Sequence, residues 1–355
     1  MTATNQLWRL ARYPEGLPTT EDLVFEKEPL ALLGEGEVRI RICYISIDPA
    51  NRLWIRPEGS YIPPFPLGSV MPAACIGVVH DSSHPRYQRG DWVQGIWGWQ
   101  DFVTLPGGPE DRQLPMEEGG ILHLPEPPLG SDYLDFFGLF GVHGLTAFFG
   151  MTDVGKVKPG DTVLISSAAG AIGSLATQIA RNLGCRVVGL AGGPEKCAKV
   201  VEQFGADACI DYKSDDIREK LSVLAPNGVD VYFDNVGGEI LEAAIDNMAH
   251  HGRIVFCGAI SQYNHSDARG PANYMKLLYK QIELKGFLVF TYMDRMEEAV
   301  ETLAGWKASG ELHMELEVRD GIDNCLGAFH SLFDGSNRGK LVMRLNESGE
   351  PGCLS

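Results

Sequence analysis

The chain has 355 residues, of which 44% are hydrophobic and 22% are charged, so it is long enough to form two globular domains with sizeable cores. Its net charge of −17 argues against binding to nucleic acid or to an anionic membrane. No apolar run has the length of a membrane-spanning helix, and the polar N-terminus predicts no secretory signal. The eight cysteines form no C-x-x-C pair and several lie in apolar runs, which favours reduced thiols and a cytoplasmic location.

The first third of the chain is predicted to be rich in β-strands and turns. Hydrophobic and charged residues alternate over 37–42, which is typical of a strand with one face in water. The segment Asp48–Met71 is dense in proline, glycine and aromatic residues, and we interpret it as a surface loop of the kind that often lines a site. Short strands are expected at Cys75–Val79 and Asp91–Gly95.

From about Asp132 onward, short apolar strands alternate with amphipathic helices. The expected strands are Asp161–Ser166, Arg186–Ala191, Ala208–Ile210, Val229–Phe233 and Arg253–Cys257, and the helices include Glu195–Phe204, Asp216–Leu224 and Glu239–Met248. This alternation predicts an α/β fold in which a doubly wound parallel sheet of the Rossmann type has helices on both faces. Further strands are predicted at Glu283–Phe290 and Gly339–Leu345, the second after a helix over Cys325–Phe333.

The first strand of this series is followed by a turn of small residues, Ala168–Gly173, and then by a helical pattern. Alanine replaces the first glycine of the motif G-x-G-x-x-G, so the match is weak by itself. Its place after the first strand of an alternating series makes it much more specific. We expect the backbone N–H groups at the start of the helix to face the pyrophosphate of a dinucleotide.

The end of the second strand is expected to distinguish NADPH from NADH. An acidic residue there would bind a ribose 2′-hydroxyl and repel a 2′-phosphate. The chain instead has Ala191-Gly192-Gly193, with Lys196 in the first turn of the next helix. This pattern predicts NADPH as the cofactor, and the alternative is that Lys196 is an ordinary solvated lysine.

The loops that follow the fourth and fifth strands, Asp234–Gly238 and Cys257–Asn264, are also expected to reach the cofactor. No cluster of histidines and cysteines has the spacing of metal ligands, so we predict no metal site. The hydride chemistry is then expected to come from the cofactor, while the protein supplies orientation and electrostatics.

With these features the chain resembles the zinc-independent medium-chain dehydrogenases/reductases, in the group of prostaglandin reductases, alkenal double-bond reductases and curcumin reductases. The stretches that carry the resemblance are Asp48-Pro49 with Arg52, Gly141–Ala147, Ala168–Gln178, Val229–Gly238, Cys257–Asn264, and Asn337 with Gly339-Lys340. The resemblance implies a β-rich, GroES-like substrate domain of residues 1–130 and 325–355, and a Rossmann NADPH-binding domain of residues 131–324. It also implies a homodimer, with Glu283–Phe290 either as the pairing edge strand or as a covered internal strand.

The resemblance further implies reduction of the carbon–carbon double bond of an α,β-unsaturated ketone or aldehyde, with hydride transfer to the β-carbon and an enolate intermediate. Tyr263 matches a family tyrosine proposed to donate a hydrogen bond to the enolate oxygen, and the alternative is that it only positions the cofactor. Tyr61 is a second candidate in the substrate pocket. The residues that the resemblance assigns to NADPH are Gly170, Ala171, Ile172 and Gly173 at the pyrophosphate, Lys196 and Tyr212 at the 2′-phosphate, and Asn235, Cys257, Gly258, Ala259, Ile260, Ser261, Tyr263, Phe287, Leu288, Val289 and Asn337 around the rest.

Departures from the family pattern leave the substrate open. Ala50 stands where many relatives have an aromatic residue, and His143 stands where proline is usual. His143 is either a proton donor near the nicotinamide or a structural residue. Two other functions also remain: an NADPH-dependent quinone reductase that uses the same hydride step, and a non-catalytic NADPH-binding accessory protein.

Overall fold

The computed structural model describes residues 4–108 and 120–345, and the chain divides into two compact units. The first unit comprises Met1–Pro127, Leu316–Asn337 and Leu341–Ser355, and the second comprises Pro128–Glu315 and Arg338–Lys340. The chain therefore leaves the first unit after Pro127 and returns to it at Leu316. In the described ranges, no helix combines the length and the hydropathy needed to cross a membrane.

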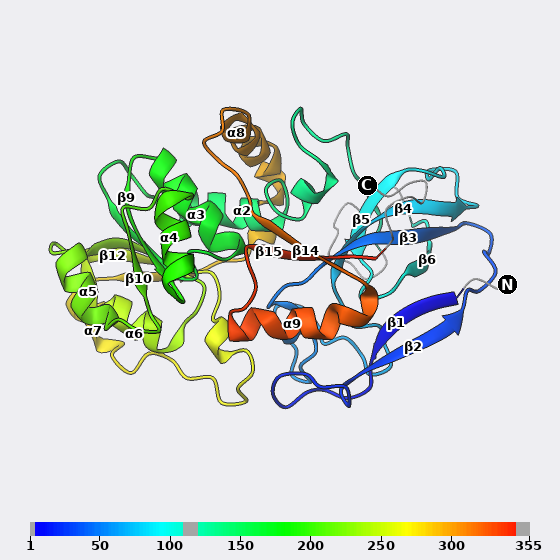
Figure 1. The fold of residues 1–355 in the computed structure, drawn as a ribbon, viewed down its shortest axis with the longest axis horizontal. Helices are drawn as coiled ribbons and strands as arrows, with labels where there is room; N and C mark the ends of the chain where they lie inside the picture. The colour runs from blue at the N-terminus through cyan, green and yellow to red at the C-terminus, as the bar shows by residue number, and fades with distance from the viewer. Residues whose placement is uncertain (1–3, 109–119, 346–355) are drawn as a thin grey trace. The chain divides into compact units, whose positions relative to one another are not determined.

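The first unit is built mainly from β-strands (Figure 1). Its strands are β1 (Thr4–Leu10), β2 (Leu23–Pro29), β3 (Glu37–Ser46), β4 (Ala74–Ser82), β5 (Trp92–Ile96), β6 (Phe102–Pro106), β7 (Leu122–His123), β14 (Leu316–Asp320) and β15 (Lys340–Arg344). The larger sheet has the order β14-β15-β3-β4-β5-β7, with β6 also paired to β3, and β1 and β2 form a separate pair. Strand β3 is antiparallel to β4, β6 and β15. The prediction of a β-rich first part is confirmed.

Among the described residues of this unit, the helices are α1 (Asn51–Trp54), the 3-10 helix η5 (Ile322–Asn324) and α9 (Cys325–Asp334). The interpretation of Asp48–Met71 as a surface loop is wrong for residues 51–55, where Asn51, Arg52, Trp54 and Ile55 are buried. The guanidinium of Arg52 donates to the carbonyl oxygens of Pro14 (2.8 Å) and Gly16 (3.0 Å). Burial lowers the pKa of Arg52 to about 10. These carbonyls are distant in sequence, so the local composition gave no sign of the burial.

The second unit contains a parallel sheet. Its strands are β8 (Thr162–Ile165), β9 (Arg186–Ala191), β10 (Ala208–Asp211), β11 (Val229–Asp234), β12 (Met248–Phe256) and β13 (Glu283–Gly286), in the order β10-β9-β8-β11-β12-β13. Its helices are η1 (Tyr133–Phe136), α2 (Val142–Phe149), η2 (Gly150–Val154), α3 (Ala171–Asn182), α4 (Pro194–Glu202), α5 (Ile217–Leu224), α6 (Gly238–Asn247), η3 (Ile260–Gln262), α7 (Met275–Tyr279), η4 (Val289–Arg295) and α8 (Met296–Ala308). Each neighbouring strand pair is parallel. The predicted doubly wound α/β fold is confirmed.

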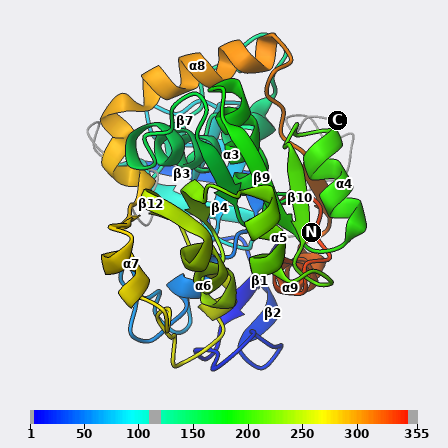
Figure 2. The same ribbon diagram turned by 90° about the vertical axis from the view of Figure 1, so that its left-hand side faces the viewer.

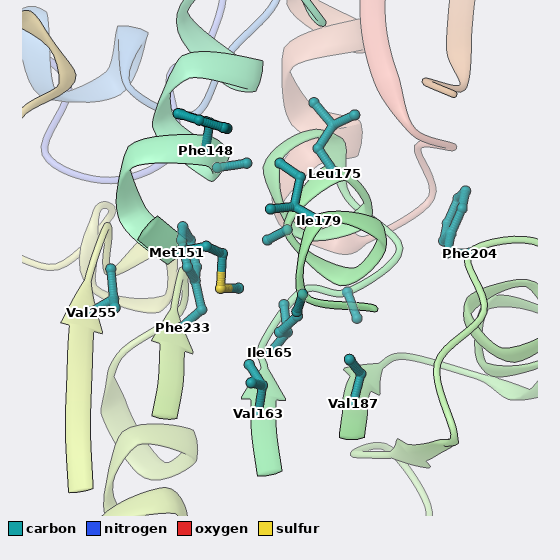
Figure 3. Close-up of a cluster of buried hydrophobic side chains, with 14 of the residues drawn as sticks. Phe148, Met151, Val163, Ile165, Leu175, Ile179, Val187, Phe204, Phe233 and Val255 are labelled. Atoms are coloured by element: carbon teal, nitrogen blue, oxygen red, sulfur yellow. The ribbon is translucent and has the colours of Figure 1, made fainter. Parts of the chain in front are cut away.

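Alternating residues of the central strands enter two different cores. Val163 and Ile165 of β8 pack with Leu175 and Ile179 of α3 on one face, as Figure 3 shows. Leu164, between them in sequence, belongs to a second cluster on the other face, with residues of α5 and α6. Helices α3 and α4 therefore cover one face of the sheet, and α5 and α6 cover the other (Figure 2). These strands consist almost entirely of apolar residues because both faces of the sheet are buried.

Several strands differ from their expected bounds, among them β12 and β13. Strand β12 begins at Met248, directly after α6, whereas a strand from Arg253 was expected. Strand β13 ends at Gly286, whereas a strand to Phe290 was expected. The chain leaves the sheet there because Phe287, Val289 and Tyr292 pack into the core beside α2.

Candidate functional site

The turn predicted to bind a pyrophosphate lies between β8 and α3. Gly170 is the N-cap of α3, and no side chain caps this helix. The first N–H groups of α3 therefore have no side-chain acceptor, and they fit an anion. A Cβ on Gly173 would lie 2.1 Å from the carbonyl oxygen of Ser167, so glycine is required for the close packing of the turn on the helix. The buried Ala168, in the first position of the motif, donates its N–H to the carbonyl of Leu190 on β9 (2.9 Å).

A distant segment lies beside this turn. Gly339 forms an isolated parallel bridge with Gly170. The φ angle of Gly339 is +65°, and a Cβ there would lie 2.4 Å from the carbonyl oxygen of Glu315. Only glycine fits both constraints. The predicted site residue Asn337 precedes this segment in the chain but belongs to the first unit, where its N–H donates to the carbonyl of Ser331 (3.3 Å).

The residues predicted to bind a 2′-phosphate gather at the ends of β9 and β10. Helix α4 begins after Gly193, lacks a side-chain cap and carries Lys196 in its first turn. The phenol oxygen of Tyr212 covers Gly192, because a Cβ on that glycine would lie 2.6 Å from it. Burial raises the pKa of Tyr212, so the phenol remains a hydroxyl donor at neutral pH. A cation, a hydroxyl and an uncapped helix start are suited to a phosphate.

Asp211, which the sequence reasoning did not single out, shapes this region. Its Oδ1 accepts the N–H groups of Gly193 (2.7 Å) and Lys213 (3.0 Å). One carboxylate thus joins the loop after β9 to the turn after β10. Its position at the end of an apolar strand could have marked Asp211 as a site residue in the sequence, since ligands in such sheets bind beyond the strand ends.

The loops after β11 and β12 interlock at the same edge of the sheet. The side-chain amide of Asn235 donates to the carbonyl of Ser166 (2.8 Å). The carbonyl of Asn235 accepts the N–H of Ile260 (3.2 Å), and that of Val236 accepts the N–H of Ser261 (3.2 Å). The structure therefore brings the predicted Asn235 and the predicted segment Cys257–Tyr263 together, next to the end of β8.

Tyr263 folds back onto its own loop. Its phenol oxygen accepts the N–H of Ala259 at 3.2 Å, and a Cβ on Gly258 would lie 2.9 Å from that oxygen. A tyrosine hydroxyl can both accept and donate a hydrogen bond. The nearby Cys257 is unsuited to act as a thiolate nucleophile, because burial raises its pKa to about 12.

The side chains of the predicted segment Phe287–Val289 differ in burial. Phe287 packs against the hydrophobic core and Val289 is buried in it, whereas Leu288 is exposed. The side chain of Val289 is therefore not available to a ligand. This segment directly follows β13, which is the neighbour of β12 in the sheet.

The two remaining candidates lie apart in the sequence. Tyr61 belongs to the first unit, where its hydroxyl oxygen accepts the indole N–H of Trp54 at 2.8 Å. His143 lies on α2 of the second unit and is buried, with its Nδ1 2.7 Å from the carbonyl oxygen of Phe137. This contact with a neighbouring carbonyl agrees with the structural interpretation of His143.

Comparison with known proteins identifies the family. A family described as "N-terminal domain of oxidoreductase" matches residues 6–110, and one described as "Zinc-binding dehydrogenase" matches residues 171–305. The NADPH-dependent curcumin reductase of Escherichia coli (strain K12) is 36% identical over 347 residues, which cover 96% of this chain and 97% of that protein. The chain belongs to the medium-chain dehydrogenases/reductases, in the curcumin and alkenal reductase group. The resemblance seen in the sequence is thereby confirmed.

Two further members of the family match over nearly the whole chain. The 2-alkenal reductase (NADP(+)-dependent) of Nicotiana tabacum is 34% identical over 342 residues, covering 95% of this chain and 96% of that one. The crystal structure of CurA from Vibrio vulnificus in complex with NADPH superimposes with a TM-score of 0.86 at 33% identity, covering 96% of this chain and 99% of that chain. Both comparisons support the assignment of the fold to this family.

The description of the second matching family includes zinc. Within residues 4–108 and 120–345, no group of three or more His, Cys, Asp or Glu side chains is placed to hold a metal ion.

Proposed function

We propose that this chain is an NADPH-dependent reductase of the carbon–carbon double bond of α,β-unsaturated ketones and aldehydes. The names of the relatives support this activity, since one is a curcumin reductase and another a 2-alkenal reductase. The observation that carries the proposal is the hydroxyl of Tyr263. It lies in the loop after β12, at the sheet edge that also holds the turn at Gly170.

The residues at this edge fit NADPH. The uncapped start of α3 would hold the pyrophosphate, and Lys196 with Tyr212 would hold the 2′-phosphate. Asn235 and the loop that ends at Tyr263 would contact the other half of the cofactor. When bound, NADPH supplies the hydride for the reduction.

In this reaction the protein would stabilise the negative charge that develops on the substrate. Negative charge collects on the carbonyl oxygen as the β-carbon is reduced, so a donor aimed at that oxygen acts mainly in the transition state. We assign this donor to the hydroxyl of Tyr263, whose oxygen is held by the N–H of Ala259. Tyr61, whose hydroxyl accepts the indole N–H of Trp54, remains the proposed polar residue of the substrate unit.

Stopped-flow oxidation of NADPH tests the proposal, with but-3-en-2-one and 1,4-benzoquinone as acceptors. We expect oxidation with the enone, and deuteride from 4-deuterated NADPH at the β-carbon of the product by NMR. Oxidation with the quinone alone would identify a quinone reductase. Tight binding of NADPH without oxidation by either acceptor would identify an accessory protein.

We also propose that the protein is a homodimer that pairs through β13. This strand is at the edge of the parallel sheet and all of its residues are exposed. Leu278 and Tyr279 of the adjacent α7 are also exposed, at 69% and 65%. An exposed edge strand beside an apolar surface is suited to pairing with a second copy.

Multi-angle light scattering of the wild type and of Leu284→Lys tests this pairing. We expect a dimer for the wild type and a monomer for the variant, because a lysine in β13 opposes edge pairing. Val223→Lys, at an exposed position of α5, is the matched control and should remain dimeric. A monomeric wild type would contradict the proposal. We further propose a cytoplasmic location; the thiols of Cys75, Cys185 and Cys325 are free, as such a location requires, whereas Cys43 is disulfide-bonded.

A further inference from the structure

A buried carboxylate connects the ends of three neighbouring strands. Asp234 is the last residue of β11 and is fully buried. Its Oδ1 accepts four hydrogen bonds, from the N–H groups of Val236 and Gly237 (2.9 Å each) and the hydroxyls of Tyr232 (2.7 Å) and Ser166 (3.3 Å). Ser166 directly follows β8, so this side chain links β11 to β8.

The main chain of Asp234 makes the third connection. Its carbonyl oxygen accepts the N–H groups of Cys257 (2.9 Å) and Gly258 (3.0 Å), which follow β12. Strand β11 lies between β8 and β12 in the sheet, so Asp234 is central to all three strand ends. The loops that begin there carry Asn235 and Tyr263.

The donors around this carboxyl fit its ionised form. Each of the four groups on Oδ1 donates a hydrogen bond, and an ionised carboxylate only accepts. A proton on Oδ2 would have no acceptor among the described residues, since no hydrogen-bond partner reaches this atom. Burial of such a charge costs free energy and raises the pKa of Asp234. The donors, two of which lie at the start of α6, offset this cost.

We propose that Asp234 is a positioning residue for the nicotinamide half of NADPH. The inference rests on the proposed cofactor. In doubly wound sheets the dinucleotide lies across the first βα turn, where the pyrophosphate binds. On one side of β8 are β9 and β10, which carry Lys196 and Tyr212 for the adenosine half. On the other side are β11 and β12, whose loops Asp234 holds in place.

The binding of two ligands to Asp234→Asn tests the inference. Asparagine keeps the shape of the side chain but loses the charge that attracts four donors. We expect the Kd of NADPH to rise about tenfold, the effect of losing one or two charge-assisted hydrogen bonds. The Kd of 2′,5′-ADP, which lacks the nicotinamide half, should stay within about twofold of the wild-type value, because Lys196 and Tyr212 are unaffected.

A second variant keeps the inference testable if Asp234→Asn fails to fold. Ser166→Ala removes the hydroxyl that donates to Asp234 and accepts the N–H of Asn235 (2.9 Å). It should weaken NADPH binding in the same selective way, by a smaller factor. Asp161→Asn is the control: this buried carboxylate precedes β8 at the opposite end of the strand, where it binds Arg253 (2.7 Å). It should lower stability and leave both Kd values unchanged.

The results separate the inference from the proposed function. If the wild type binds neither NADPH nor 2′,5′-ADP, the proposed cofactor is wrong. If the wild type binds both, the inference is overturned by an unchanged Kd of NADPH in the folded Asp234 and Ser166 variants. Equal weakening of both ligands would also overturn it, since that result would indicate a general structural role.

Discussion

The phenol oxygen of Tyr263 accepts a hydrogen bond of 3.2 Å from the backbone N–H of Ala259, four residues earlier in the same loop. The carbonyl of Asn235 in turn holds the N–H of Ile260, so the loops after β11 and β12 form one hydrogen-bonded assembly. The hydroxyl proposed to stabilise the enolate is thus fixed by backbone that is predicted to contact the cofactor. Donor and cofactor would be positioned together.

Tyr263→Phe should lower turnover with an enone about tenfold or more, because the variant lacks the donor to the developing oxyanion. Steady-state kinetics and NADPH titration measure the effect. The KM for NADPH should change much less than turnover. Tyr274→Phe, at an exposed tyrosine of the same unit, is the control and should behave as the wild type. Weaker NADPH binding with unchanged turnover would show that Tyr263 only positions the cofactor.

Lys196→Ala should reduce the preference for NADPH over NADH. The side chain lies in the first turn of α4, where a cation would pair with the 2′-phosphate that NADH lacks. We expect the KM of NADPH to rise about tenfold and that of NADH to stay the same. Lys220→Ala, on α5 beside Asp215, controls for the loss of a surface charge. An unchanged ratio of the two KM values would remove the role assigned to Lys196.

The order of strands and helices was predictable because each central strand is a short apolar run that both faces of the sheet bury. The turn at Gly170 was also predictable, because it follows the first strand of this alternating series and that position makes the glycine motif specific. The network around Asp234 was not, because its partners Ser166 and Gly258 are brought to it only by the parallel pairing of strands. The burial of Arg52 was hidden likewise, as its acceptors lie far away in the sequence.

Asp246 is expected to contribute stability that depends on pH. Burial alone would raise its pKa, but hydrogen bonds from Lys276, Arg218 and Asn273 lower it to about 2. A carboxylate with a lowered pKa in the folded state stabilises the protein above its ordinary pKa of 3.8, and this contribution is lost as the pH falls towards 2. Asp246→Asn should therefore lower the free energy of unfolding at pH 7.

The expected loss is on the order of 1 kcal/mol, because solvent screens this partly exposed group. Urea unfolding from pH 7 to pH 4 and below measures it, and the difference from the wild type should shrink as Asp246 is protonated. Asp267→Asn, in an exposed ion pair with Arg269, should change stability by only a few tenths of a kcal/mol. A difference that stays constant down to the lowest pH at which the protein folds would contradict the assigned pKa.

Gly173→Ala and Gly305→Ala should have opposite effects on stability, although both place a methyl group on a helix. A Cβ at Gly173 would meet the carbonyl oxygen of Ser167 at 2.1 Å, whereas one at Gly305 of α8 would have no neighbour within 4 Å. The first change forces the backbone of the cofactor turn to move and should cost about 1–3 kcal/mol together with NADPH affinity. The second replaces the poorest helix former except proline by the best, and should add up to about 1 kcal/mol. Urea unfolding and NADPH titration of the two variants compare them directly. A Gly173→Ala variant as stable as the wild type would show that α3 does not need its close contact with Ser167.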